Sequence, residues 1–186
     1  MEDHILRIMG AVCILTSTAL WGEMKARSLG LRLTQLQHLQ QALRLLATEI
    51  TYTATPLPHA FQRIGNRVRG PVGEIFIVAA DYMKNHDEMS AGDAWKQALQ
   101  QKSEKTFFTG EDLKVAEQLG VSLGLSDGEG QLKQIHMVSQ QLEYALEESR
   151  HARNRNERMW RYLGVLGGLA IIIFFCRREG KSWILI

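Results

Sequence analysis

Residues 29–50, LGLRLTQLQHLQQALRLLATEI, decide the fold class of this chain. Apolar residues recur in this stretch at spacings of 4, 3, 3, 4, 3 and 4, which places them along one face of an α-helix. The recurring residues are Leu29, Leu33, Leu36, Leu39, Leu43, Leu46 and Ile50. The pattern predicts a long helix whose apolar face is buried either in the core of the same chain or against a second copy.

Further helices begin at recognisable capping patterns. Pro56 disfavours helical backbone at Thr55 and suits the first position of the next helix, with Thr55 as its N-cap. Three later segments carry an S/T-x-x-D/E pattern, the signature of a capping box, and begin at Ser90, Thr109 and Ser126. We therefore predict an all-α fold, a small helical bundle.

Both ends of the chain are apolar. Residues 5–21 (ILRIMGAVCILTSTALW) contain Arg7 as the single charge, and residues 162–176 (YLGVLGGLAIIIFFC) contain none. A helix of the length of the first segment spans roughly 25 Å, slightly less than the hydrocarbon core of a bilayer, about 30 Å, and the second segment is shorter and marginal for a span. We predict a transmembrane anchor at 1–23, a cytoplasmic domain at 24–161, a transmembrane helix at 162–176 and a short tail at 177–186.

Each predicted span has an alternative. A cleaved signal peptide requires a basic start, whereas this chain begins Met1-Glu2-Asp3-His4, so we favour a retained anchor. The second segment is short enough to be a buried core helix, but it is apolar on all sides. Gly164 and Gly168 in this segment have the GxxxG spacing that lets two membrane helices pack closely.

Cations flank the two segments on the side of the central domain. Lys25, Arg27 and Arg32 follow the first segment, and an arginine-rich stretch precedes the second. That stretch contains Arg150, Arg153, Arg155, Arg158 and Arg161. The positive-inside rule therefore places the central domain in the cytoplasm. These arginines are either a solvated face or a docking surface for anionic headgroups or an acidic partner.

The sequence contains no pattern that indicates catalysis or a metal site. The phosphate-loop pattern GxxxxGK[ST], HExxH and G-x-S-x-G are absent, and the six histidines have no ligand spacing. Cys13 and Cys176 lie in apolar segments at opposite ends of the chain. The net charge of +2 does not indicate a nucleic-acid partner. We therefore expect a non-enzyme without a cofactor or metal.

Acidic residues at helix starts are candidate contacts for a basic partner. They are Asp112, Asp127 and Glu129. The alternative is that these carboxylates only cap helices, where they interact favourably with the helix dipole.

Several motifs together resemble the stage III sporulation protein AB family. The most specific is E-I-x-Y-x-x-T-P-L-P, formed by Glu49, Ile50, Tyr52, Thr55, Pro56, Leu57 and Pro58. Smaller matches occur at Ala94-Trp95, Leu119-Gly120, Leu123-Gly124, Gln140–Glu143 and Met159–Gly164. The resemblance extends over nearly the whole chain to about Phe175. The tail at 177–186 departs from the usual ending of the family.

The resemblance implies an endospore-forming bacterium and a position in the mother-cell membrane that faces the forespore. The family contributes there to a channel likened to specialised secretion systems, and its soluble domain is similar to the cytoplasmic repeats of type II secretion and type IV pilus platform proteins. The implied partners are a secretion-type ATPase and membrane subunits of the channel. The function expected by this analogy is that of a platform.

Two further hypotheses concern the partners. Platform proteins carry two such repeats and this chain carries one, so a homodimer, with Gly164, Gly168 and the leucine face as contacts, would restore two. The alternative function is a membrane-anchored adaptor or sensor that binds a small ligand or another membrane protein. It would require a pocket with convergent polar groups.

Overall fold

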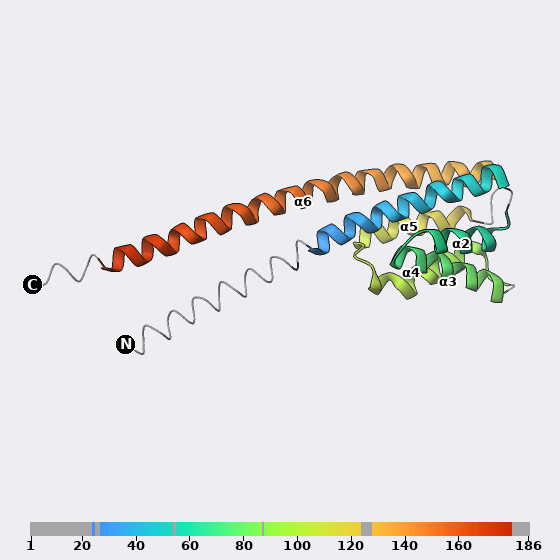
Figure 1. The fold of residues 1–186 in the computed structure, drawn as a ribbon. Coiled ribbons are helices and arrows are strands. Elements are labelled where there is room, and N and C mark those ends of the chain that lie inside the picture. Colours follow the sequence, from blue (N-terminus) through green and yellow to red (C-terminus); the bar gives the residue numbers. More distant parts are fainter. Residues whose placement is uncertain (1–23, 25–26, 54, 87, 124–127, 180–186) are drawn as a thin grey trace, which may run out of the picture. The chain divides into compact units, whose positions relative to one another are not determined.

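The computed structural model describes residues 24, 27–53, 55–86, 88–123 and 128–179 (Figure 1). Regular structure in these residues is helical throughout, so the prediction of an all-α fold is confirmed. The first helix covers residues 27–48 and continues directly into a π-helical turn, η1 (Glu49–Thr53). The elements that follow are α2 (Leu57–Arg67), α3 (Pro71–Asn85), α4 (Ala91–Lys102), the short 3₁₀-helix η2 (Ser103–Lys105), α5 (Gly110–Ser122) and α6 (Gly128–Glu179).

The chain divides into two units. One unit is Ser28–Arg150, and it contains the hydrophobic core. The other comprises Met1–Arg27 and His151–Ile186, of which the structure describes residues 24, 27 and 151–179. Residues of helix α6 belong to both units, and neither Pro nor Gly interrupts this helix between residues 131 and 163.

The apolar face of the first helix lies inside the Ser28–Arg150 unit. Five of its leucines are buried there, and Ile50 packs against the same core. The buried leucines are Leu33, Leu36, Leu39, Leu43 and Leu46. The intramolecular alternative for this face is therefore confirmed. A homodimer formed through these leucines is inconsistent with the structure, because their side chains are already covered by the same chain.

An aromatic cluster joins the middle helices. Trp95 of α4 is fully buried, edge-on to Phe61 of α2 and 4.9 Å in centroid distance from Phe76 of α3. Its indole Nε1 donates a hydrogen bond of 2.7 Å to the carbonyl oxygen of Ala116 in α5. A buried tryptophan requires such an acceptor, so this one residue fixes the positions of four helices.

Glycines allow two helix pairs to approach backbone to backbone. A Cβ atom at Gly73 of α3 would collide with the carbonyl oxygen of Val68 and lie 2.7 Å from that of Gly65 in α2. A Cβ atom at Gly92 of α4 would collide with the carbonyl oxygen of Gly120 in α5. Any larger side chain would force these helices apart.

The predicted helix starts are confirmed at two of the four sites. Ser90 accepts a hydrogen bond from the Asp93 amide, and Thr109 forms a complete capping box with Asp112. The start at Ser126 lies outside the described residues. The prediction for α2 was wrong by one residue, because Pro56 is the N-cap and Leu57 begins the helix.

In the part of the chain that the structure describes, no helix is long and apolar enough to cross a membrane. The first predicted span, at 1–23, lies outside the described residues. The backbone of the second, at 162–176, is part of α6, but its side chains lie outside the described part. Both spans therefore remain predictions.

Candidate functional site

A hydrogen-bonded network fixes the corner between η1 and α2. The guanidinium Nη2 of Arg63 lies 2.7 Å from the Glu49 carboxylate and donates a hydrogen bond of 2.7 Å to the hydroxyl of Thr55. The Thr55 hydroxyl in turn donates to Glu49 at 3.2 Å. Thr55 is therefore engaged with Glu49 and Arg63 instead of capping α2. Pro58 then occupies the first turn of α2, where the proline ring is tolerated.

Tyr52 stands out from this corner. Its side chain is 82 % exposed, in contrast to the buried leucines of the helix that precedes it. Tyrosine is enriched among the residues that dominate the energy of protein–protein interfaces, and π-helical turns are frequent at functional sites. The sequence interpretation placed Tyr52 only in a structural motif. The structure makes it a candidate contact.

A partly buried ionic cluster connects the first helix, α5 and α6. Arg32 binds the Asp112 carboxylate with two hydrogen bonds, from Nε at 2.8 Å and from Nη2 at 2.9 Å. The same Nη2 lies 3.5 Å from a carboxylate oxygen of Glu148 in α6. Two parallel bonds of this kind fix orientation as well as distance. The cluster therefore fixes the first helix against α5, and the exposed Glu148 adds a weaker contact to α6.

The environment of Asp112 determines its charge state. Burial alone raises the pKa of this carboxyl, but the hydrogen bonds from Arg32 and from the Thr109 backbone amide outweigh burial and hold the pKa below its ordinary value. The hydrogen bond to Asp112 likewise raises the pKa of Arg32. Asp112 is only 1 % exposed, so its carboxylate is not accessible to a partner. Its role in this structure is the alternative one, that of capping a helix.

The remaining predicted contact residues are distributed along α6. Glu129 is exposed in its first turn, and exposed arginines follow further along the helix. These are Arg150, which lies 3.5 Å from Glu147, and Arg153 and Arg155. Asp127 lies outside the described residues, as do the side chain of Arg158 and the surroundings of Gly164 and Gly168. The structure thus brings none of the described α6 candidates together with Asp112.

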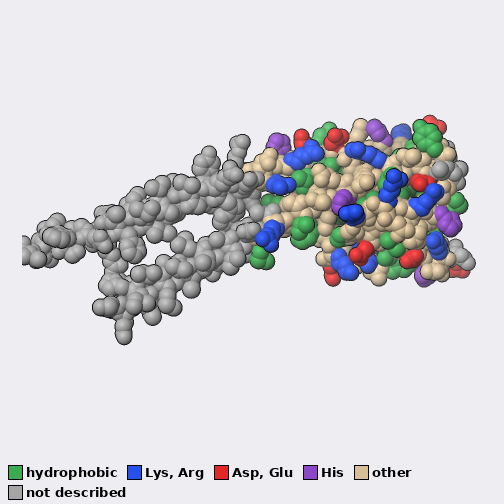
Figure 2. All heavy atoms as spheres, viewed as in Figure 1, with side chains coloured by type: hydrophobic (Ala, Val, Ile, Leu, Met, Phe, Trp, Pro, Cys, Tyr) green, Lys and Arg blue, Asp and Glu red, His purple; other side chains and the backbone are tan. Residues whose placement is uncertain are grey.

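Charged side chains are mixed on the face of the Ser28–Arg150 unit in view (Figure 2). Basic, acidic and histidine side chains alternate there, with hydrophobic ones scattered between them. This face has no broad area of one sign, unlike the basic surface typical of a nucleic-acid-binding protein.

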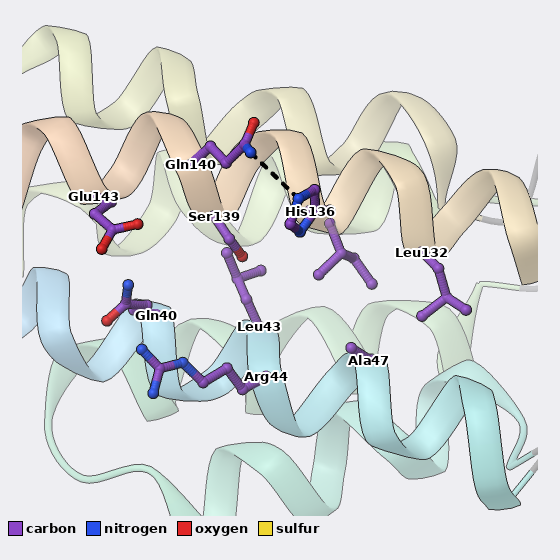
Figure 3. Close-up of a pocket in the computed structure, with 10 residues that line it drawn as sticks. Gln40, Leu43, Arg44, Ala47, Leu132, His136, Ser139, Gln140 and Glu143 are labelled. Atoms are coloured by element: carbon purple, nitrogen blue, oxygen red, sulfur yellow. Dashed lines mark hydrogen bonds between the residues drawn. The ribbon is translucent and has the colours of Figure 1, made fainter.

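A groove runs between the first helix and α6 (Figure 3). Its volume is about 420 Å³. Its apolar part is formed by Leu43, Ala47, Leu132 and Ile135. Its polar part is formed by Gln40, Arg44, His136, Ser139, Gln140 and Glu143.

Opposite charges lie on the two sides of this groove. Arg44 belongs to the first helix and Glu143 to α6, and neither forms an ion pair with another described residue. Beside them on α6, an amide–imidazole contact of 3.3 Å joins Gln140 to His136. Among the described residues, no group of three or more His, Cys, Asp or Glu side chains has a geometry suited to a metal ion. The groove is thus equipped for binding through apolar and ionic contacts.

The sequence interpretation missed the groove because it exists only when two segments about ninety residues apart are paired. The sequence does contain one indication of the groove. Ala47 and Ser139 are small residues that interrupt runs of larger side chains on the two facing stripes. Helical periodicity identifies each stripe separately but does not show which stripes face each other.

Comparison with known proteins identifies the family. A family model described as "Stage III sporulation protein AB" matches residues 7–176, most of the chain. The chain belongs to the stage III sporulation protein AB family. The resemblance inferred from the sequence motifs is thereby confirmed.

Two members of the stage III sporulation protein AB family give the extent of the match. The protein of this name from Bacillus subtilis (strain 168) is 32 % identical over 169 residues, which cover 91 % of this chain and 98 % of the relative. A solved structure of a stage III sporulation protein AB superimposes with a TM-score of 0.63 at 30 % identity. The superposition covers 67 % of this chain and 98 % of the solved chain, so the family relationship includes the helical fold.

Proposed function

We propose that this chain is a non-catalytic platform component of a sporulation secretion-like channel between mother cell and forespore. It lies in the mother-cell membrane that faces the forespore, with its helical unit in the cytoplasm. There it engages a secretion-type ATPase and other membrane proteins of the channel. Family membership supports this proposal, and the family match at residues 7–176 includes most of both apolar segments.

The observation that carries the proposal is the ionic cluster around Arg32. The first helix follows one predicted anchor in sequence, and α6 contains the other. Arg32 joins these two helices to each other and to α5 through Asp112 and Glu148. The bonds to Asp112 are short and partly buried and resist displacement, whereas Glu148 is exposed and adds a weaker contact. The first helix and α6 also share the hydrophobic core, which holds them together. A force applied to the helical unit would therefore reach both anchors together, as a platform requires.

The corner that carries Tyr52 is the proposed contact for the ATPase. Tyr52 follows Ile50, and a Cβ atom at Gly128 would lie 3.7 Å from Cγ2 of Ile50, so η1 and the start of α6 are neighbours. Exposed Glu129 thus lies in the same region of the unit. A rigidly mounted aromatic side chain with a carboxylate nearby suits a partner that has an apolar socket and a basic rim.

Co-purification of the detergent-extracted full chain with the ATPase tests this proposal. Tyr52→Ala is expected to weaken capture of the ATPase by about tenfold, as for a residue that dominates an interface. Val121→Ala is the control, because Val121 is 71 % exposed but lies on α5. Equal capture by both variants would refute the contact at Tyr52, and absence of any capture by the unaltered chain would refute the platform function.

The groove supports a second candidate function, a membrane-anchored adaptor or sensor for a small ligand. Its volume is within the range of ligand sites, roughly 300–1,000 Å³. However, its polar groups are spread along two helices and do not converge on one point (Figure 3). A metabolite that raises the Tm of the full chain, together with failure to retain any channel protein or ATPase, would favour this function over the platform.

A further inference from the structure

We propose that the groove between the first helix and α6 is a docking site for an amphipathic helix of a second, different protein. The acidic flank of that helix would face Arg44 and its basic flank would face Glu143. This site is separate from the proposed ATPase contact at Tyr52.

The shape of the groove fits a helix. On α6 the lining residues are spaced i, i+3, i+4, i+7, i+8 and i+11, from Leu132 to Glu143, so they form one stripe along the helix. On the first helix Gln40, Leu43, Arg44 and Ala47 form the facing stripe. Eleven residues of helix rise about 16 Å, so the groove accepts roughly three turns of a docked helix.

The groove remains open because its walls contain small side chains. Ala47 of the first helix and Ser139 of α6 both line it and are small. Leu43 and Ile135 are buried beneath and belong to the core, so the apolar surface open to a partner is that of Ala47 and Leu132, which are partly exposed. Side chains from a third helix would fill this space without rearrangement of the unit, which lowers the cost of binding.

The charges of the groove indicate what kind of partner it binds. Arg44 and Glu143 face the groove from opposite helices without an ion pair to any described residue (Figure 3). A surface for nucleic acid or anionic lipid would present one sign, whereas this one presents both signs beside the partly exposed apolar side chains of Ala47 and Leu132. Only a partner with carboxylate and cationic flanks on either side of an apolar stripe satisfies all three features.

A second copy of this chain does not fit the groove. In a twofold dimer whose axis passes through the groove, the groove would face itself, and two hollows leave an unfilled space between them. The exposed apolar side chains next to the groove point instead to a larger, convex partner. Met137 is 43 % exposed and Tyr144 is 77 % exposed, three residues before and four residues after Gln140 on α6. Both would contact the outer side of a docked helix.

Photocross-linking of the full chain in sporulating cells tests the inference. A photoreactive amino acid at Ser139 is expected to form an adduct with one segment of another protein, mapped by mass spectrometry, whose sequence has an apolar stripe with acidic and basic flanks. Arg44→Glu is expected to reduce this adduct about tenfold, because like charges would then face each other. Replacement of the facing carboxylate of the partner by lysine should restore it.

Matched controls separate this site from the platform proposal. Lys96→Glu, an exposed reversal on α4, should leave the adduct unchanged, and the Tm of Arg44→Glu should equal that of the unaltered chain. Tyr52→Ala should reduce capture of the ATPase but not the adduct at Ser139. Adducts only with lipid or with a second copy of this chain, or an adduct insensitive to Arg44→Glu, would overturn the inference.

Discussion

Asp112 shows how a single residue acquires a role that its local sequence does not reveal. The Thr109-x-x-Asp112 pattern predicted a cap, which the structure confirms. The partner that buries this carboxylate, Arg32, lies 80 residues earlier in the chain. Capping is a local property and can be inferred from four residues. The ion pair depends on tertiary packing, so neither residue could be assigned to it from the sequence.

Replacement of Asp112 by asparagine should destabilise the fold. Asparagine removes the negative charge and one of the two acceptor oxygens, so Arg32, which is 12 % exposed, would keep one neutral acceptor and the more distant Glu148. We expect a loss of about 2 kcal/mol, seen as a Tm lower by roughly 8 °C in thermal melting of the full chain in detergent. Glu148→Gln is the control. Glu148 is exposed, so its loss should cost less than about 1 kcal/mol. Equal shifts for the two variants would contradict this assignment.

The pKa of Asp112 also predicts a dependence of stability on pH. Its value in the folded chain is lowered below the ordinary 3.8, and the charged groups that face it are Arg32 and, through Arg32, Glu148. A lowered pKa stabilises the fold above the unfolded pKa, and this stabilisation is lost as the pH falls through the folded value. Between pH 5 and pH 3, the Tm of the unaltered chain should therefore fall more steeply than that of Asp112→Asn. Parallel curves would exclude this explanation.

At the scale of elements, the sequence predicted each helix better than the contacts between helices. The leucine face and the unbroken α6 follow from helical periodicity. The caps at Ser90 and Thr109 follow from local hydrogen bonding. The predicted start of α2 was wrong because the Thr55 hydroxyl forms hydrogen bonds with Glu49 and with Arg63, which lies in α2 itself. The groove was missed for a related reason, since it depends on which helical faces pair.

Gly92 tests the close contact between α4 and α5. Gly92→Ala should lower the Tm, because the added methyl group collides with the carbonyl oxygen of Gly120, and overpacking of this kind costs about 1–3 kcal/mol. Gly110→Ala is the matched control, since nothing lies within 4 Å of a Cβ atom there. Its Tm should be unchanged or slightly higher, as expected for alanine in a helix. A tolerated Gly92→Ala would show that α4 and α5 are not packed backbone to backbone.

At the scale of the whole molecule, membrane topology is the main prediction that the described residues do not test. The family model matches most of both apolar segments, which is consistent with a common architecture. The Ser28–Arg150 unit has its own core, so its fold does not depend on the topology of the ends. The sequence alone thus predicted which helices make up this unit, but not which helical faces pair with one another and which remain on the surface.

Labelling of a cysteine at Ser182 tests the topology. With Cys13 and Cys176 replaced by alanine and the chain expressed in non-sporulating cells, where the far side of the membrane faces the medium, Ser182→Cys should react in intact cells with a maleimide that does not cross membranes. Two spans place the tail on the opposite side from the central domain. Lys96→Cys on α4 should react only after the cells are opened. Protection of both positions in intact cells would contradict two spans.

The wide π turn at Glu49–Thr53 fixes how many residues the chain needs between the first helix and α2. Each residue gained or lost at a helix end rotates the following backbone by about 100°. Deletion of Thr51 would therefore swing Thr55 and Pro56 away from Glu49 and Arg63 and turn the tyrosine ring toward a different side. Relatives of this chain should accordingly vary in length elsewhere and keep the count constant at this corner.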